Sequence, residues 1–299
     1  GDGPDLNEIS YEFIDQFKKK LEEDYPSTSS MRHLHVARFN AVINLGKNNG
    51  CISRNFCPKL PAYPLFPSDR SLSEKNLKDI FLLFNHKLKN DPHIKKDDTL
   101  SLALFILDIA FQGLAPTDLA ALKIRDLKFS TLSSGFNPTI DDFGDGKNVE
   151  IVTIKTLRQK TGIPVSIATA LSPIKHIIKA LSKGKRSDDY LIPCFDKKKN
   201  YTLEQRQARL ANFFHKMTVS MNSAICSHYG FLSDRKVTFY FARHAYCNLV
   251  DSLDIPRHLI QYLIGHRVTI LEKNYLRRIT VAEQVAISCK IFQILSSTP

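Results

Sequence analysis

The last third of the chain contains the densest group of side chains that can do chemistry. They lie in three segments, Tyr240–His244, Ile264–Arg267 and Asn274–Leu276. Alone, each residue also has a structural explanation: Arg243 can be a buried arginine paired to a carboxylate, His266 can cap a helix C-terminus, and Tyr275 can be an interface aromatic. They follow Tyr240 in this order, at intervals of 3, 23 and 9 residues. A guanidinium, an imidazole and a phenol can together bind an anion, transfer a proton and attack as a nucleophile. Their joint spacing therefore carries more weight than any single residue.

The net charge predicts a polyanionic partner. The 299 residues include 42 Lys and Arg against 30 Asp and Glu, which gives a formal net charge of +12. Nucleic acid is the first candidate, because each neutralised phosphate releases counterions and adds affinity. The runs Lys18–Lys20 and Lys197–Lys199 are more typical of solvated surfaces. A membrane partner is the weaker alternative, because the basic residues are dispersed and the most apolar stretch, Leu100–Phe111, is interrupted by Asp108.

The cysteines predict no metal site and no disulfide framework. Six of them are spread over the chain and none forms a Cys-x-x-Cys pair. Neither a zinc finger nor a disulfide scaffold is therefore indicated, and we expect a reducing, intracellular location.

The elements that must position the reactive residues are predicted to be mainly helical. Apolar residues at helical spacing indicate one helix over Ile9–Tyr25 and a second from Ser29 or Ser30 through Ile43. Arg32 and Arg38 flank the apolar stripe of the second helix, where their long side chains can reach a ligand. Four prolines between residues 58 and 67 indicate a linker, so we predict domains at 1–70 and 71–299.

The second domain is predicted to hold a small antiparallel sheet among helices. Helices are expected over Leu72–Leu88, over Thr99–Phe111 and, after the break at Gly113–Pro116, to about Lys123. Short β-branched segments predict the strands Leu127–Thr131, Val149–Thr156 and Ile163–Ala168. From Ser172 onward the pattern is helical to the C-terminus. The fold class is therefore mainly α with one small antiparallel sheet.

Several of these segments resemble the tyrosine recombinases, or phage-type integrases, and particularly those of Bacteroides-like mobile elements. The resemblance covers nearly the whole chain. The matching residues are Tyr240–His244, Leu263–His266, Tyr275, Lys160–Gly162 and Gly113–Lys123. It implies a helical N-terminal core-binding domain (1–70) and a C-terminal catalytic domain (71–299) that form a clamp around double-stranded DNA. It also implies a bacterial enzyme of DNA recombination and integration, located in the cytoplasm at the nucleoid.

The resemblance assigns a role to each reactive residue. Tyr275 would attack a DNA phosphodiester and remain attached as a 3′-phosphotyrosine, without ATP, metal or cofactor. Arg243 would hold the phosphate, and His266 would donate to its oxygens or help handle the tyrosine proton. Lys160, on a hairpin, would act as general acid for the departing 5′-hydroxyl. Tyr240, where most members have histidine, can still donate a hydrogen bond.

One expected residue is missing from the pattern. The family's first arginine would fall at Ala115 or, in some members, at Gln112, and neither position holds an arginine. Asp118 matches the family's supporting acid but has no evident arginine to orient. Losing one transition-state donor typically costs about 10²–10³ in rate. A nearby cation can substitute, and the sequence offers three: Lys123, Arg125 and Arg158.

Three functions remain open at this point. The first is an active recombinase, the second a DNA-binding protein of recombinase descent that has lost cleavage, and the third a topoisomerase IB-like nicking and resealing enzyme. Joint retention of the tyrosine, histidine, arginine and lysine favours activity, because a protein that only binds DNA needs no nucleophile.

The ends of the chain raise two further expectations. The apolar stripe from Val281 to Leu295 predicts a terminal helix that packs on its own domain or docks on a neighbouring protomer. The resemblance implies a homo-tetramer on DNA and allows a DNA-bending accessory protein. Since the chain begins at Gly1 with no initiator Met, an upstream arm-binding domain can precede it.

Overall fold

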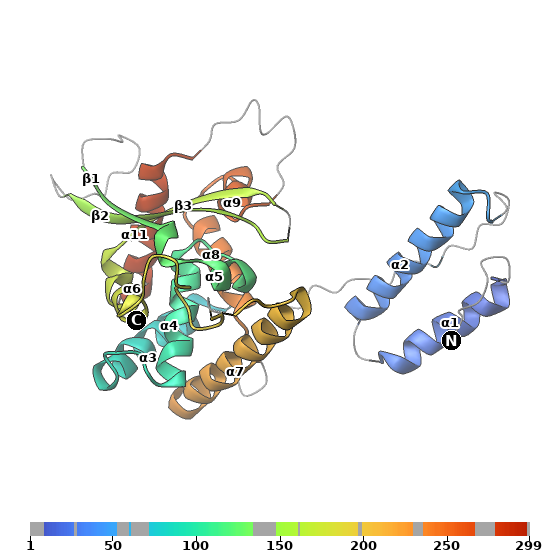
Figure 1. Ribbon diagram of the computed structural model, residues 1–299, viewed down its shortest axis with the longest axis horizontal. Coiled ribbons are helices and arrows are strands. Elements are labelled where there is room, and N and C mark those ends of the chain that lie inside the picture. Colours follow the sequence, from blue (N-terminus) through green and yellow to red (C-terminus); the bar gives the residue numbers. More distant parts are fainter. Residues whose placement is uncertain are drawn as a thin grey trace. The chain divides into compact units, whose positions relative to one another are not determined.

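The computed structural model describes residues 9–26, 29–52, 60, 72–133, 148–160, 162–196, 199–229, 236–266 and 279–297. The chain forms two compact units, Gly1–Asp69 and Arg70–Pro299, each with its own hydrophobic core (Figure 1).

The first unit is a pair of helices. These are α1 (Tyr11–Asp24) and α2 (Ser29–Asn48). The hydroxyl of Ser10 caps α1 by accepting the N–H of Phe13 at 3.1 Å, which satisfies a donor that the first helical turn leaves unpaired. The Phe17 and Phe39 rings stack across the helix pair at 5.1 Å between centroids. The unit thus packs one apolar stripe from each predicted helix against the other.

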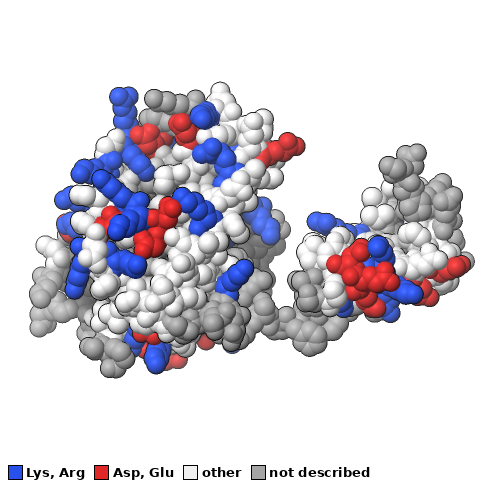
Figure 2. Space-filling view, turned by 90° about the horizontal axis from the view of Figure 1, so that it is seen from below, with Lys and Arg blue, Asp and Glu red and all other residues white. Residues whose placement is uncertain are grey.

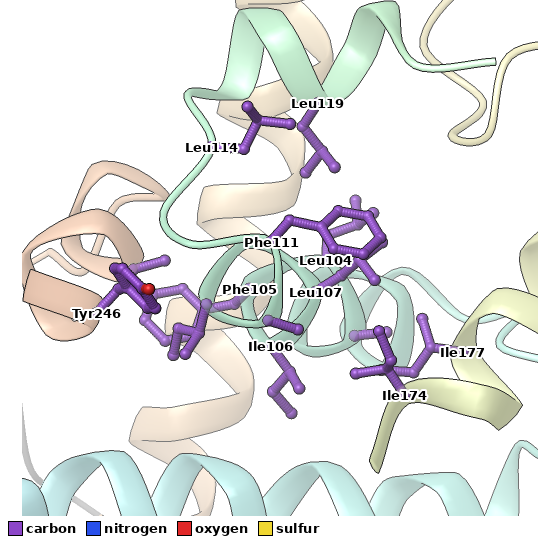
Figure 3. Close-up of a cluster of buried hydrophobic side chains, with 14 of the residues drawn as sticks. Leu104, Phe105, Ile106, Leu107, Phe111, Leu114, Leu119, Ile174, Ile177 and Tyr246 are labelled. Carbon is purple, nitrogen blue, oxygen red and sulfur yellow. The ribbon is translucent and has the colours of Figure 1, made fainter. Parts of the chain in front are cut away.

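The second unit is a mainly helical domain around one buried helix. Its helices are α3 (Glu74–Asn90), α4 (Asp97–Ala110), α5 (Pro116–Ala121), α6 (Lys175–Ser182), α7 (Leu203–Tyr229), α8 (Tyr240–Asp251), α9 (Arg257–Leu263) and α11 (Val281–Ser296), with short 3₁₀ turns at Ile124–Asp126 and Ser172–Ile174. Every residue of α4 from Thr99 onward is buried. Figure 3 shows its Phe105, Leu107 and neighbouring side chains packed between residues of the other elements. Burial of this many apolar side chains makes α4 the centre of the core.

The three strands form one antiparallel sheet in the order β1-β2-β3, as the sequence predicts. Their bounds are Leu127–Leu132, Val149–Leu157 and Pro164–Ala170. On one face, Ile154 and Ile167 pair across the strands and join the main core. On the other face, Ala168 and Ala170 pack with Val285 of α11 (Figure 1). The sheet is therefore covered on both faces along β3.

The prediction of continuous helix after Ser172 is wrong for residues 183–196. There the chain makes turns, and Tyr190 forms an isolated antiparallel bridge with Lys123. Gly184 with its positive φ of 73° and Pro193 explain the break, because glycine favours helix ends and proline lacks the N–H a helix needs. Among the described residues, no helix has the length and apolarity to cross a membrane.

Candidate active site

Arg243 is held inside the second unit by backbone carbonyls. Its side chain leaves α8 and its residue is only 5% exposed. Nη1 donates to the carbonyl of Gly113 and Nη2 to the carbonyl of Ile264, both at 2.7 Å. Burial lowers its pKa, and the neighbouring charge of Arg158 lowers it further, yet an arginine stays protonated in proteins. The guanidinium thus ties together the segments after α4 and α9 and stays charged.

Two glycines make room for this arrangement. Gly113 has a φ of 64°, and an added Cβ would lie 2.8 Å from the Cα of Arg243. Gly265 has a φ of 66°, and its Cβ would lie 2.6 Å from Cγ2 of Val165 and 3.4 Å from Cγ and Cδ of Arg158. Because L-residues rarely adopt such φ values and a Cβ does not fit 2.8 Å from Arg243 or 2.6 Å from Val165, both positions require glycine.

Arg158 lies beside Arg243 and is held by the acid that the sequence leaves without an arginine. It follows β2, and its Nη1 donates to the carbonyl of Ile264 at 2.6 Å. Its Nε is 2.8 Å from Oδ2 of Asp118. Oδ1 of Asp118 accepts the backbone N–H of Gln159 at 2.7 Å. Both guanidiniums therefore donate to one carbonyl oxygen, and one carboxylate fixes the end of β2.

A second acid, Asp108 of α4, interacts electrostatically with both guanidiniums. It is fully buried, and neither carboxyl oxygen has a hydrogen-bond partner in the described part of the chain. Burial raises its pKa well above the ordinary value, against the opposing effect of Arg243 and Arg158. Burial also raises the pKa of Asp118, less strongly, because Gln159 and Arg158 stabilise its charge. We call Asp108, Asp118, Arg158 and Arg243 the arginine cluster.

His266 is placed at the edge of the arginine cluster by the end of α9. Its backbone N–H donates to the carbonyl of Gln261 at 2.9 Å at the end of α9. Its ring is exposed, and its pKa is lowered by partial burial and then by Arg243 and Arg158. The imidazole is therefore biased toward its neutral form, in which one ring nitrogen can accept a proton.

Tyr240 and Lys160 lie on elements that adjoin the cluster. Tyr240, which is 43% exposed, stands at the start of α8, and its ring meets that of His244 edge-on at 5.1 Å. Lys160 is exposed in the turn between β2 and β3, which closes through the N–H of Gly162 and the carbonyl of Arg158 at 2.8 Å. The structure thus places the reactive residues predicted on α8, on the hairpin and after α9 in one region of one unit. Tyr275 lies outside the described residues.

Gln112, one of the two positions where the missing arginine was sought, has a different task. It is buried with a φ of 60°, and its Nε2 donates to Oε1 of Gln284 at 2.8 Å and to the carbonyl of Ala168 at 3.3 Å. Gln284 also accepts the N–H of Ala168 at 2.9 Å. Nearby, the hydroxyls of Thr169 and Ser288 lie 2.6 Å apart. These four side chains, which we call the glutamine cluster, join α11 to β3.

Of the three cations that could replace the missing arginine, Lys123 and Arg125 interact elsewhere. The ammonium of Lys123 lies 5.5 Å from the centre of the Tyr190 ring. Arg125 pairs with Asp188 at 2.6 Å on the exposed surface. Arg158 is the member of the trio that reaches the site. The sequence alone does not single it out, because Arg158 lies just beyond the end of β2 and its partner Asp118 comes from the distant helix α5.

The predicted DNA contacts of the first unit differ in their surroundings. Nε and Nη2 of Arg32 donate to the carbonyls of Tyr25 and Pro26 at 2.7 and 2.6 Å, and so fix the connection between α1 and α2. Arg38 is exposed on α2. A role of either in DNA binding stays a prediction. Figure 2 shows a face of each unit on which basic and acidic side chains are mixed, so the excess positive charge does not make that face uniformly basic.

The described residues include no group of three or more His, Cys, Asp or Glu that could hold a metal ion. The side chains that gather at the site are instead cations, their acidic partners and an imidazole. Such a set suits the binding of an anion.

Comparison with solved structures identifies the fold. A lambda integrase dimer bound to a COC′ core site matches with a TM-score of 0.56 and 14% identity, over 93% of this chain and 86% of that one. The Tn1549 transposon integrase in complex with transposon right end DNA matches with a TM-score of 0.51 and 12% identity, over 95% and 85%. No family model and no curated protein matches the sequence. The chain therefore has the integrase fold that the resemblance to tyrosine recombinases implies.

Proposed function

We propose that this chain is a site-specific DNA recombinase or integrase that cleaves and rejoins double-stranded DNA through a 3′-phosphotyrosyl intermediate. One observation carries the proposal: within an integrase fold, a buried and permanently charged Arg243 lies near His266, whose pKa is lowered by partial burial and by that charge, next to a hairpin that carries Lys160. A guanidinium held by carbonyls needs no reorganisation when negative charge develops on a phosphate. The net charge of +12 supports DNA as the partner.

The residues divide the proposed reaction between them. The hydroxyl oxygen of Tyr275 attacks phosphorus, and its proton passes to the neutral imidazole of His266. Arg243 neutralises the charge on the non-bridging oxygens, and Tyr240 adds a hydrogen bond. The bond from phosphorus to the 5′-oxygen breaks, and Lys160 gives that oxygen a proton. A 5′-hydroxyl of another strand then reverses these steps and releases Tyr275. One phosphoester replaces another at each stage, so no ATP and no metal ion is consumed.

The remaining features of the proposal concern assembly and setting. α11 packs on β3 and α3 of its own unit, which is one of the two arrangements predicted for the terminal helix. We propose a homo-tetramer on DNA, with a DNA-bending protein as an accessory, in a bacterial mobile-element context at the nucleoid.

The test is formation of a covalent adduct. The full chain is used to select duplexes from a random-sequence pool, and a selected duplex is nicked near its centre so that cleavage traps the protein on DNA. We expect an adduct with the wild-type chain that disappears in Tyr275→Phe and persists in Tyr201→Phe, which loses a hydroxyl elsewhere in the unit. The adduct is measured as a band of reduced mobility in a denaturing gel.

The same assay separates the alternatives. Selected duplexes that bind without any adduct would show a DNA-binding protein of recombinase descent, the function that the missing arginine at Ala115 favours. Relaxation of a supercoiled plasmid without exchange of strands between two duplexes would show a topoisomerase-like enzyme instead.

A further inference from the structure

We propose that Arg158 is the second phosphate-binding guanidinium of this site and a catalytic residue, supplied by the end of β2 instead of by the loop between α4 and α5. The catalytic part of this inference rests on the proposed function, whereas the phosphate-binding part can be tested without it. It adds to that function a residue that the family pattern would place elsewhere in the chain.

The first argument is the shared carbonyl. Nη1 of Arg158 and Nη2 of Arg243 donate to the same oxygen of Ile264, at 2.6 and 2.7 Å. Two guanidiniums that meet at one oxygen repel each other, and the charge of Arg158 indeed lowers the pKa of Arg243. Such a pair is most favourable when an anion lies between or in front of its members.

The second argument is the charge balance of the arginine cluster. Asp118 neutralises Arg158 through an ion pair of 2.8 Å. Asp108 has no hydrogen bond to Arg243 among the described residues, and burial raises its pKa, which favours the uncharged acid. With Asp108 protonated, the cluster has one positive charge in excess. A phosphodiester brings the one negative charge that would compensate it.

The third argument is the number of donors that remain. A guanidinium has five N–H groups. Within the described ranges each arginine uses two of them, Arg158 on Asp118 and Ile264, and Arg243 on Gly113 and Ile264. Each therefore keeps three N–H groups for a ligand, enough for a bidentate contact to the phosphate from either side.

The fourth argument is preorganisation. Asp118 holds both the side chain of Arg158 and the N–H of Gln159, so the acid fixes the arginine and the strand end that carries it. The Arg158 side chain is only 13% exposed. Its Cγ and Cδ pack against Gly265, in ordinary van der Waals contact with the position a Cβ would take, at 3.4 Å. A donor fixed in this way can stabilise a transition state without first being ordered.

The first test measures anion binding, which requires neither Tyr275 nor a DNA site. Inorganic phosphate is titrated into the full chain while the arginine Nε–H resonances are recorded. We expect saturable shifts for Arg158 and Arg243. We expect phosphate affinity to fall about tenfold or more in Arg158→Ala and to be unchanged in Arg125→Ala, which removes an equal charge at an exposed ion pair. Equal affinity in the wild type and both variants would overturn the inference.

The second test measures the rate of adduct formation on the selected nicked duplex. Arg158→Ala should slow it by about 10²–10³, and Arg125→Ala should leave it within about twofold. Added methylguanidine should restore part of the rate to Arg158→Ala, which a purely structural role would not allow. A second-site change, Ala115→Arg, should accelerate Arg158→Ala but not the wild type, whose site already has two guanidiniums.

A second variant, which keeps the positive charge, keeps the test decisive if Arg158→Ala does not fold. Arg158→Lys can retain the pair with Asp118, but its ammonium cannot make a bidentate contact. If Arg158→Ala fails to fold, Arg158→Lys decides: weakened phosphate binding supports the inference, and wild-type binding overturns it. A wild-type rate in Arg158→Ala would overturn it and leave the proposed function intact. Phosphate shifts that depend on Arg158, in a protein that forms no adduct, would overturn the proposed function alone.

Discussion

The arginine cluster and the glutamine cluster are both polar and largely buried, and adjacent residues of one loop, Gln112 and Gly113, belong to the glutamine cluster and contact Arg243 respectively. They differ in what their donors do. In the glutamine cluster, neutral amides and hydroxyls bond to one another and to the backbone of β3. In the arginine cluster, charged groups bond to carbonyls and to Asp118 and still keep N–H groups in reserve.

The difference distinguishes a structural joint from the proposed anion-binding site. Buried polar groups are normally satisfied by partners within the protein. Where α11 meets β3, Nε2 of Gln112, Oε1 of Gln284 and the hydroxyls of Thr169 and Ser288 have such partners, and among the described residues Oε1 of Gln112 has none. A charged group that is buried and only partly used is costly unless a ligand completes it. The comparison therefore explains why the missing arginine is not found at Gln112: that position belongs to the joint.

The largest expected effect is that of Gln112→Arg. Placing a guanidinium in the glutamine cluster buries a charge without an acid to pair it, so the free energy of unfolding should fall by about 3–5 kcal/mol. Urea unfolding followed by circular dichroism measures the change. Ala115→Arg is the control, because Ala115 is half-buried at the start of α5 and should change stability little. A Gln112→Arg protein as stable as the wild type, with faster adduct formation, would erase the distinction between the two clusters.

Gly265→Ala is expected to cause a smaller decrease in the free energy of unfolding. The added methyl must fit 2.6 Å from Val165 at a positive φ, so we expect the free energy of unfolding to fall by about 2–4 kcal/mol. Gly184→Ala shares the positive φ, at 73°, but meets no atom within 4 Å. It should therefore lose only about 1–2 kcal/mol. Thermal unfolding of both variants isolates the steric part, and equal losses would show that the cluster does not require the close approach.

The smallest effect at neutral pH is expected from Asp108→Asn. Because burial raises the folded pKa of Asp108, the wild-type free energy of unfolding should decrease as the pH rises from the unfolded value of 3.8 through the folded pKa. The asparagine variant should lack this decrease and become relatively more stable with rising pH. Unfolding between about pH 5 and about pH 9 measures it. Asp188→Asn, at an exposed ion pair, is the control: it keeps Asp108, so its free energy of unfolding should decrease with rising pH as that of the wild type does.

The opposite slope would revise the charge balance of the arginine cluster. If Asp108→Asn becomes less stable than the wild type as the pH rises, Asp108 is ionised and serves as the counter-ion of Arg243.

Much of the fold follows from local patterns in the sequence. Helical spacing predicts α1 to α4, and β-branched runs predict all three strands to within two residues at either end. The break after α6 was missed, because Gly184 and Pro193 lie among residues whose composition is otherwise compatible with a helix. The spacing of apolar residues along the sequence reflects which face of a helix or strand is buried, so the type and position of an element can be predicted from it.

The site was only partly predictable. The spacing of Arg243 and His266 along the chain matches the motif of the tyrosine recombinases, so we could expect the two residues to lie close together. Arg158 was one of three equivalent cations in the sequence, and only tertiary packing distinguishes it, by bringing Asp118 next to the end of β2. The function of Gln112 was hidden for the same reason, since its partner Gln284 is far away along the chain.

The position of Arg158 two residues before Lys160 has a mechanical consequence. If the second phosphate-binding arginine came from the loop between α4 and α5, it would stay in place when the β2–β3 turn moved. In the proposed reaction, Arg158 and Lys160 belong to the same β2–β3 arm, so a displacement of that arm would remove phosphate binding and leaving-group protonation together. Each protomer would then have a natural means of remaining idle while another one cuts.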